Sequence, residues 1–325
     1  MNKKYSSLFL SFLRESTDRL GYDFEYVDKE SGRLVRVSNG NHSCLFGANP
    51  IRLWPFNSSI TNSICRDKEL TNRILADFGI STPKSRIGFA DLSSYKHFST
   101  QPTSVFDLDY FDFGIPVVIK PNDGSQGKGI SIIHDFNFVT KAIENARKES
   151  NAILIQEYVE GKDYRLYVLL GIPILIVERQ KDFFFGDGNK SVTDLIKESP
   201  SYEKFIKANY GFSISLQSYL EKYGDFSPKL GERIDVYPVT NFSQAGRSIS
   251  ISQEVPVEWN DLCMKIFKAL DIDFFAVDCR LSKDKKFNPI VIEVNADPGI
   301  QMIIQEKPEI ARNLVDYLVK EAVFR

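Results

Sequence analysis

Two apolar segments near the C-terminal end of the chain each lead into side chains that carry oxygen donors. Residues 289–292 predict a buried strand, and Glu293 and Asn295 follow at a spacing of two, which places both on one face of a strand. Residues 274–277 predict a neighbouring strand that ends at Asp278. Oxygen donors suit Mg²⁺, so Asp278, Glu293 and Asn295 form a candidate metal site. Taken alone, a short Glu-x-Asn motif is more often a strand end with a solvated glutamate.

Composition limits the classes of protein to which the chain can belong. Its 325 residues suffice for about two or three domains. Hydrophobic residues make up 42% and charged residues 26%, as in ordinary globular proteins. The net charge of -2 comes without a Lys/Arg block, so we expect no nucleic-acid partner. The four cysteines are scattered without a Cys-x-x-Cys motif, which argues against a zinc site or a disulfide framework and favours a cytoplasmic protein.

The first twenty residues begin with lysines and an apolar run, as a signal peptide does. Serines interrupt this run, Arg14 and Glu15 follow it, and no small-residue cleavage site is present. We therefore predict an amphipathic helix over residues 6–20 rather than a signal peptide. No run approaches the roughly 18 apolar residues of a membrane span, so we expect no membrane partner.

The remaining chain mixes short strands with helices. Strands are predicted over 24–27, 34–37, 43–46, 117–120, 129–133 and 152–159, and as a hairpin of 165–170 and 173–179 around Gly171. Helices are predicted over 67–78, 136–148, 258–270 and 309–323, with two or three short ones in the polar insertion 187–230. Residues 236–251 predict a further strand and loop. We find no internal repeat and no low-complexity linker.

A glycine-rich segment, residues 121–129, lies between two predicted strands. Its three glycines free the backbone to approach a ligand and to turn N–H groups toward an anion. The spacing fits neither a P-loop nor a dinucleotide-binding turn, so we predict a hairpin flap with Lys120 at its base as a point charge for phosphate. The alternative is an ordinary glycine hairpin with a surface lysine.

Two further groups of residues carry potential chemistry. The strand that ends at Glu157 leads into Tyr158 and Val159, whose backbone could meet an adenine edge, with Asp163 beyond for ribose hydroxyls. Arg165 and Arg179 are predicted to face each other across the hairpin, where they could neutralise a phosphoryl group or a carboxylate. The alternatives are a plain strand end and a solvated, salt-bridged sheet face.

The order of these features resembles that of the ATP-grasp superfamily of carboxylate–amine ligases. The resemblance runs from about residue 65 to the C-terminus, and several independent motifs carry it. Residues 67–71 and 79–83 resemble the opening helix of the nucleotide domain, residues 118–121 with the flap resemble the phosphate-covering loop, and residues 292–295 resemble the magnesium strand. The resemblance implies an α+β (α/β) protein with the ATP-grasp fold, in which two subdomains sandwich ATP between antiparallel sheets.

This fold implies three parts. We expect an N-terminal α/β domain over residues 1–86, a central subdomain with the flap over 87–160, and a C-terminal subdomain with the magnesium site over 161–325. Members of the superfamily are often homodimers, but no stripe in this sequence identifies an interface.

Within the superfamily, the sequence most resembles the ligase domain of cyanophycin synthetase and the C-terminal module of bifunctional glutathione synthetase. The shared segments are residues 161–166, 186–196 and 241–246. The last departs from the pattern Asn-Leu-Ser-x-Gly-Gly by placing Ala245 at the first glycine, which leaves the loop conformation open. We expect neither a glutamate–cysteine ligase module in front nor a Mur-ligase-like module behind. Ala276 stands where D-alanine–D-alanine ligases carry an arginine, which argues against that specificity.

The resemblance also implies a role for each candidate residue. The ATP phosphates would be held by Lys68, Lys120 and the flap residues Asp123, Gly124, Ser125, Gln126, Gly127 and Gly129. Glu157, Tyr158 and Val159 would read adenine, and Asp163 would bind ribose. Asp278, Glu293 and Asn295 would hold two Mg²⁺ ions, or Mn²⁺ in their place. Arg165, Arg179, Asn241 and Arg247 would contact the γ-phosphate, an acyl-phosphate and a substrate carboxylate.

Three functional hypotheses follow. The first is an ATP- and Mg²⁺-dependent ligase that joins the carboxylate of a small amino acid or peptide to an amine through an acyl-phosphate, with release of ADP and phosphate. The second is a ligase of the same superfamily that modifies a ribosomal peptide or a protein side chain. The third is a nucleotide-binding regulatory protein without catalysis, against which the intact set of Lys120, Asp278, Glu293 and Asn295 argues.

Overall fold

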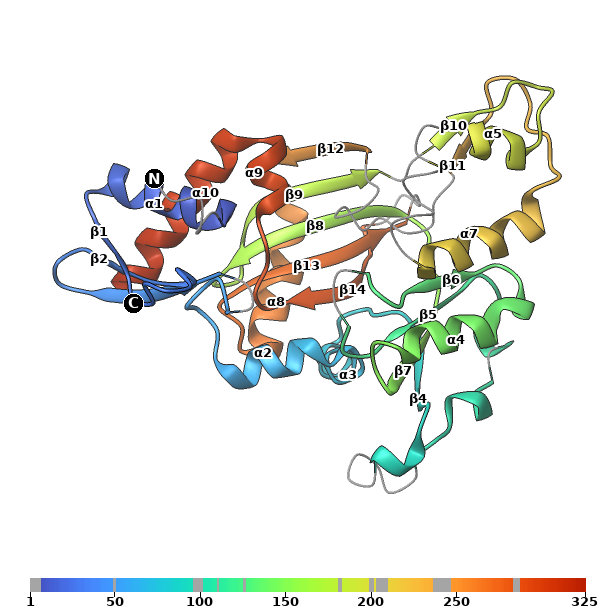
Figure 1. Ribbon diagram of the computed structural model, residues 1–325, viewed down its shortest axis with the longest axis horizontal. Coiled ribbons are helices and arrows are strands. Elements are labelled where there is room, and N and C mark those ends of the chain that lie inside the picture. The colour runs from blue at the N-terminus through green and yellow to red at the C-terminus, as the bar shows by residue number, and fades with distance from the viewer. Residues whose placement is uncertain are drawn as a thin grey trace.

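The chain folds into four antiparallel sheets within the described residues, and helices pack on each of them (Figure 1). The computed structural model describes residues 7–48, 51–95, 102–109, 111–124, 127–180, 183–198, 202, 210–235, 247–282 and 287–325. A three-stranded sheet lies at one end of the molecule, a five-stranded sheet in the middle and a four-stranded sheet at the other end. The predicted mixture of helix and antiparallel sheet is confirmed.

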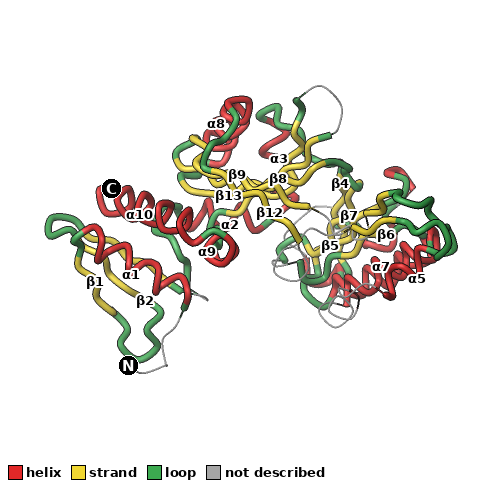
Figure 2. The backbone as a smooth tube through the Cα atoms, turned by 90° about the horizontal axis from the view of Figure 1, so that it is seen from above, coloured by secondary structure: helices red, strands yellow, loops and turns green. Residues whose placement is uncertain are grey.

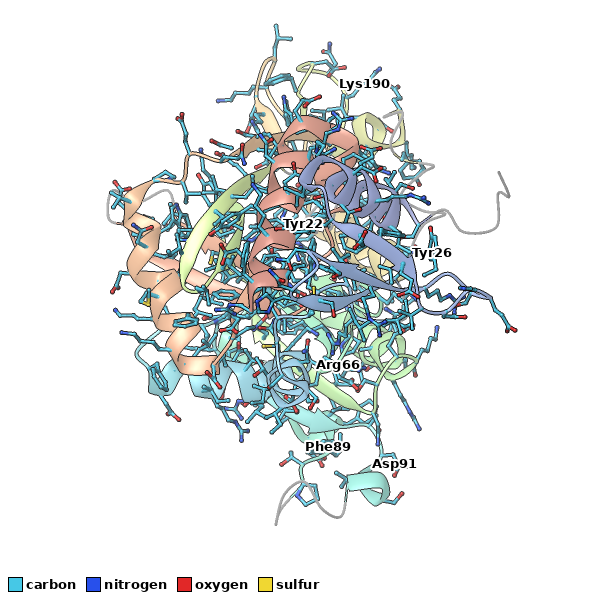
Figure 3. All side chains as sticks on the ribbon, turned by 90° about the vertical axis from the view of Figure 1, so that its left-hand side faces the viewer. Tyr22, Tyr26, Arg66, Phe89, Asp91 and Lys190 are labelled. Atoms are coloured by element: carbon cyan, nitrogen blue, oxygen red, sulfur yellow. The ribbon has the colours of Figure 1, made fainter. Side chains whose placement is uncertain are left out.

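Helices from both ends of the chain pack against the N-terminal, three-stranded sheet. Its elements are α1 (Leu8–Leu20), β1 (Asp23–Tyr26), β2 (Leu34–Ser38), β3 (Ser43–Gly47) and the C-terminal helix α10 (Pro308–Phe324). Helix α1 ends where Gly21 takes a left-handed conformation with φ of 67°, which glycine adopts without steric cost. Figure 3 shows α1 and α10 side by side, and the Arg19 guanidinium donates two hydrogen bonds of 3.0 and 2.7 Å to the Asp316 carboxylate between them.

The five-stranded sheet has the order β12-β9-β8-β13-β14. Its strands are β12 (Arg247–Ser252), β9 (Ile172–Gln180), β8 (Lys162–Leu169), β13 (Phe274–Leu281) and β14 (Pro289–Asn295). One face packs on α8 (Asn260–Leu270). Part of the other face packs on the N-terminal unit, by which we mean the three-stranded sheet with α1 and α10. Figure 2 shows α8 and α9 (Gln301–Glu306) on opposite sides of this sheet.

The strand predicted to end at Asp278 is three residues longer than expected. Strand β13 continues to Leu281 and pairs with β8 over its whole length. The alternation of side chains explains the extension, because Cys279 continues the buried row of Phe275 and Val277 toward α8. Asp278 therefore lies within the strand rather than at its end.

The four-stranded sheet has the order β4-β7-β5-β6. Its strands are β4 (Ser85–Phe89), β7 (Ala152–Glu157), β5 (Val117–Pro121) and β6 (Ser131–Ile133), and α4 (Val139–Arg147) and α7 (Tyr210–Tyr223) pack against them. Beside this sheet stands a ribbon of β10 (Phe183–Phe185) and β11 (Arg233–Asp235) with α5 (Val192–Glu198). Short 3-10 turns cover Leu92–Tyr95, Val105–Asp107, Phe111–Phe113, Phe136–Phe138 and Val257–Trp259.

Several predicted boundaries change. Strand β6 begins at Ser131 because Gly129, with φ of 70°, lies outside the extended region. Helix α9 was not predicted. Residues 57–60 predict a helix cap, and α2 (Ser59–Arg66) follows the N-cap Ser58, whose side chain accepts from the N–H of Thr61. Helix α3 (Lys68–Asp77) begins as predicted, after Asp67.

Two other sequence predictions concern the domain division and membrane spans. The predicted domain division stays a prediction, although β4 spans its boundary at residue 86. None of the helices in the described ranges combines the length and the apolar character needed to cross a bilayer.

The contact between α10 and α1 yields a stability prediction. Leu318 is fully buried in the core that these helices share. Replacing Leu318 by Ala removes buried methyl groups and leaves a cavity, so we expect the free energy of unfolding to fall by about 2–5 kcal/mol. Leu230→Ala, at a side chain that is 81% exposed, is the matched control and should change it by less than about 0.5 kcal/mol. Urea denaturation measures both; an equal effect would contradict the assigned core.

Candidate active site

One face of the five-stranded sheet is divided into an apolar and a polar part. Tyr167 and Ala276 belong to the core that the N-terminal unit covers, and the same rows of side chains continue with Arg165 and Asp278. Tyr167 stands at the division, where its hydroxyl donates to the carbonyl of Gly299 (2.8 Å). The polar part lies beyond the N-terminal unit.

The three predicted oxygen donors lie on this polar part. Asp278 of β13 is directly opposite Glu293 of β14, and Asn295 is opposite Ala276, two residues along. The prediction that Glu293 and Asn295 share a face is therefore confirmed. The register of this strand pair shifts immediately after Asp278, and such irregularities commonly re-aim side chains next to active sites.

Arginines surround the carboxylate of Asp278. Arg179 donates to Oδ1 of Asp278 through Nη2, and Nη1 of Arg165 lies 3.6 Å from Oδ2. The two arginines do not face each other as predicted, because the β8–β9 register, which shifts at Tyr167, places Arg165 opposite Val177. They meet through the carboxylate instead.

A second carboxylate extends this cluster. Nε of Arg179 lies 3.2 Å from Oδ1 of Asp163, and Nη2 of Arg280 lies 3.0 Å from Oδ2. All three side chains are at most one-tenth exposed, and buried charges require such pairing. Burial raises the pKa of Asp278, while the nearby Arg165 and Arg179 oppose the rise.

Two lysines reach the same place from other elements. Lys68 is the first residue of α3, and its Nζ lies 3.8 Å from Oε1 of Glu293. Lys120 lies on β5, where burial lowers its pKa to about 8, with a further lowering by Lys68 and an opposing effect of Glu293. The four-stranded sheet, α3 and the five-stranded sheet therefore contribute to one cluster of charges.

The glycine-rich flap connects two antiparallel strands, as predicted. Strands β5 and β6 pair from Val117 with Ile133 to Ile119 with Ser131. Lys68 Nζ donates to the carbonyl of Gly124 (2.6 Å), which ties the flap to α3. A Cβ at Gly129 would lie 2.7 Å from Cγ of Pro121, so the close return of the flap over β5 requires glycine there.

For the other predicted site residues, the predicted roles stay predictions. Glu157 ends β7, and its Oε1 accepts a hydrogen bond from the N–H of Lys84 (2.8 Å); Tyr158 and Val159 follow it. Asp123 and Gly127 are described flap residues. Ser125, Gln126 and Asn241 lie outside the described residues, as does the side chain of Arg247, whose backbone begins β12.

Sequence reasoning missed two residues of the site. Arg280 was placed beyond the end of its strand; the alternation of residues 274, 276, 278 and 280 was the signal that could have placed it on the polar face. Asn122 was treated as part of the flap, although it is only 4% exposed. No local pattern marks it, because its partners come from α3.

The donor set fits Mg²⁺. Asp278 and Glu293 offer carboxylate oxygens from paired strands and Asn295 offers an amide oxygen on the same face, which are the hard ligands that this ion prefers. Within the described ranges, no cluster of three or more His, Cys, Asp or Glu residues suited to a metal occurs, so the third donor of this set is the amide of Asn295. The lysines and arginines nearby suit substrate phosphates, which could serve as additional ligands of the metal ion.

Comparison with known proteins agrees with this geometry. The family described as the ATP-grasp domain matches residues 65–299, and the chain belongs to this family. Cyanophycin synthetase of Nostoc sp. (strain PCC 7120 / SAG 25.82 / UTEX 2576) is 28% identical over 266 residues, which cover 76% of this chain and 28% of that protein. The glutathione biosynthesis bifunctional protein of Desulfotalea psychrophila (strain LSv54 / DSM 12343) is 24% identical over 320 residues, covering 90% and 38%. The chain thus spans well under half of these two relatives.

Solved structures support the fold. A bifunctional glutathione synthetase from Pasteurella multocida matches with a TM-score of 0.52 and 20% identity, over 97% of this chain and 43% of that one. The D-alanine–D-alanine ligase from Bacillus anthracis matches with a TM-score of 0.50 and 19% identity, over 85% and 72%. The predicted ATP-grasp fold and family are confirmed.

Proposed function

We propose that this protein is an ATP- and Mg²⁺-dependent ligase that joins the carboxylate of a small amino acid or peptide to an amine, with release of ADP and phosphate. The observation that carries the proposal is the polar face of the five-stranded sheet. There, the paired carboxylates Asp278 and Glu293 lie among lysines and arginines from α3, β5, β8 and β9. Such an array suits a polyphosphate with its metal ion, and phosphoryl transfer depends mainly on positioning and charge neutralisation.

The nucleotide and its metal ion would occupy the space between the two larger sheets. Lys68 and Lys120 hold the phosphates, and the flap covers them. Asp278, Glu293 and Asn295 would hold Mg²⁺, which would supply charge neutralisation for the phosphates. Glu157 and the two residues after it would hold adenine, and Asp163, whose carboxylate already pairs with Arg179 and Arg280, would bind ribose hydroxyls.

The reaction would proceed in two transfers. A carboxylate oxygen of the first substrate attacks the γ-phosphorus, the bond to the β,γ-bridging oxygen breaks, and ADP leaves. The amine of the second substrate then attacks the carbonyl carbon of the acyl-phosphate, the bond to the phosphate oxygen breaks, and the amine loses a proton as the amide forms. Arg165 and Arg179 stabilise the negative charge during the first transfer, and the closed flap keeps water from the acyl-phosphate.

Product analysis tests this proposal. The protein is incubated with ATP, Mg²⁺ and pooled amino acids and short peptides, and products are identified by mass spectrometry while ADP and AMP are measured. A product equal to two substrates minus water, formed with ADP, supports the proposal. Formation of AMP and pyrophosphate would contradict it. ADP release only with a peptide or protein acceptor would shift the substrate class to a macromolecule.

The lowered pKa of Lys120 predicts a pH dependence of nucleotide binding. A group with a pKa of about 8 is charged below pH 8 and loses its attraction for phosphate above it, so MgADP affinity should fall about tenfold between pH 7.5 and 9.5. Protein stability should move the opposite way. Between pH 8 and the ordinary lysine pKa of 10.5, the unfolded chain binds more protons, and the contribution of Lys120 to the free energy of unfolding rises with pH.

Calorimetric titration of Lys120→Arg provides the comparison. Arginine stays charged throughout this range, so the loss of affinity should shrink to less than about twofold. An equal loss in the variant and the original protein would assign the pH dependence to another group.

A further inference from the structure

The side chain of Asn122 joins the base of the flap to the first turn of α3. Its Oδ1 accepts a hydrogen bond from the N–H of Glu69 (2.9 Å), and its Nδ2 donates to Oδ1 of Asp67 (2.8 Å). Its carbonyl oxygen accepts from the N–H of Lys68 (3.2 Å). Three consecutive residues of the helix start are thus bonded to one residue of the four-stranded subdomain.

The arrangement is a helix cap shared between two elements. Asp67 is the N-cap of α3, and the same Oδ1 accepts from the N–H of Leu70 (2.9 Å). First-turn N–H groups lack partners within their own helix, and Asn122 supplies one to Glu69 from outside. Because Asn122 is buried, water cannot easily replace these bonds.

This shared cap determines where two lysines lie relative to each other. Lys68 stands within the capped turn, and its Nζ donates to the carbonyls of Asn122 (3.3 Å) and Gly124 (2.6 Å). Lys120 lies on β5, two residues before Asn122. The N–H of Asn122 donates to the carbonyl of Ala152 (2.9 Å) at the start of β7, which fixes this end of β5. A shift of α3 against β5 would separate the two ammonium groups.

We propose that Asn122 is a positioning residue of the nucleotide site, which holds the start of α3 against the flap so that Lys68 and Lys120 meet the phosphates together. The inference rests on the proposed function, because it assigns both lysines to a nucleotide. Asn122 acts through Lys68 and does not itself contact the reacting atoms.

Asn122→Asp tests the bond to Asp67 with almost no change of shape. The variant places two carboxylates where a donor met an acceptor, which displaces the start of α3. Calorimetry with MgADP on the full chain should show affinity weakened about tenfold. The exchanged pair Asp67→Asn with Asn122→Asp removes the second carboxylate and restores one donor and one acceptor between the two side chains. The N–H of Leu70 loses its bond to Oδ1 of residue 67 but lies at an exposed position where water can accept from it, so the affinity should return to within about threefold of the original. Asp67→Ala removes the acceptor of this bond from the helix side and should also weaken MgADP binding, so it serves as the second variant if Asn122→Asp fails to fold.

Two further measurements separate positioning from general support of the fold. In a Lys68→Met background, Asn122→Asp should change MgADP affinity by less than about twofold, because its effect passes through Lys68. Asn151→Asp makes the same change at a side chain that donates to the carbonyl of Asp91, which lies near the lower end of the molecule in Figure 3, and should leave the affinity unchanged.

The outcomes distinguish this inference from the proposed function. Tight MgADP binding by the original protein with an unchanged affinity in Asn122→Asp would overturn the inference alone. An equal loss with and without Lys68, or no recovery in the exchanged pair, would also overturn it. Failure of the original protein to bind MgADP would overturn both the inference and the proposed function.

Discussion

Replacement of Glu293 by Gln is expected to reduce ATP turnover by about 10³-fold or more. Glu293 is the carboxylate that faces Asp278 across the strand pair and lies near Lys68, so it is placed to hold the metal ion against the phosphates. A neutral amide of the same shape binds Mg²⁺ weakly and leaves the charge of Lys68 uncompensated. ADP release in the presence of the active substrate pool measures the loss.

The same substitution should hardly affect folding. The side chain of Glu293 is 30% exposed and its ion pair with Lys68 spans 3.8 Å, so its contribution to the free energy of unfolding is at most about 1 kcal/mol. Glu178→Gln is the matched control, because Glu178 lies in the same sheet and pairs with Lys162 (2.9 Å). Full activity in Glu293→Gln, or equal losses in both variants, would contradict the metal assignment.

Replacement of Arg165 by Met should lower the turnover number by about 10³-fold while MgADP affinity falls less than about threefold. Arg165 lies opposite Asp278 in the β8–β13 pair, where its guanidinium can stabilise the phosphoryl group in transfer. ADP lacks that group, so its binding depends on other residues. Asp278 retains its hydrogen bond from Arg179, which limits the loss of stability.

Paired kinetic and calorimetric measurements check this difference. Arg36→Met, at an exposed arginine that pairs with Glu25 across 3.5 Å in the N-terminal sheet, should change neither quantity. A loss of MgADP affinity in Arg165→Met as large as its loss of turnover would assign Arg165 to nucleotide binding and not to the transfer step.

Local patterns in the sequence were enough to predict the ligand-bearing strands. The alternation around Glu293 and Asn295 depends only on the geometry of one strand, and the apolar runs before them mark buried strands. The hairpin at the flap was predictable for a similar reason, since glycines between two apolar runs favour a turn between paired strands. The resemblance to the ATP-grasp superfamily joined these parts into one fold.

Contacts between distant elements could not be predicted in this way. The pairing of Arg280 with Asp163 depends on the β8–β13 register, and the bonds of Asn122 depend on where α3 starts. Likewise, nothing in the C-terminal segment shows that α10 packs on α1. These features arise from the packing of complete elements, which periodicity does not describe.

Transfer of ¹⁸O from a labelled carboxylate tests the central claim most directly. The protein is supplied with ATP, Mg²⁺ and the pooled amino acids and peptides labelled with ¹⁸O in their carboxyl groups, and the released phosphate is analysed by mass spectrometry. The acyl-phosphate mechanism predicts that the inorganic phosphate carries one ¹⁸O atom from the substrate and that ADP carries none. Unlabelled phosphate, or label recovered in AMP, would contradict the proposed ligase.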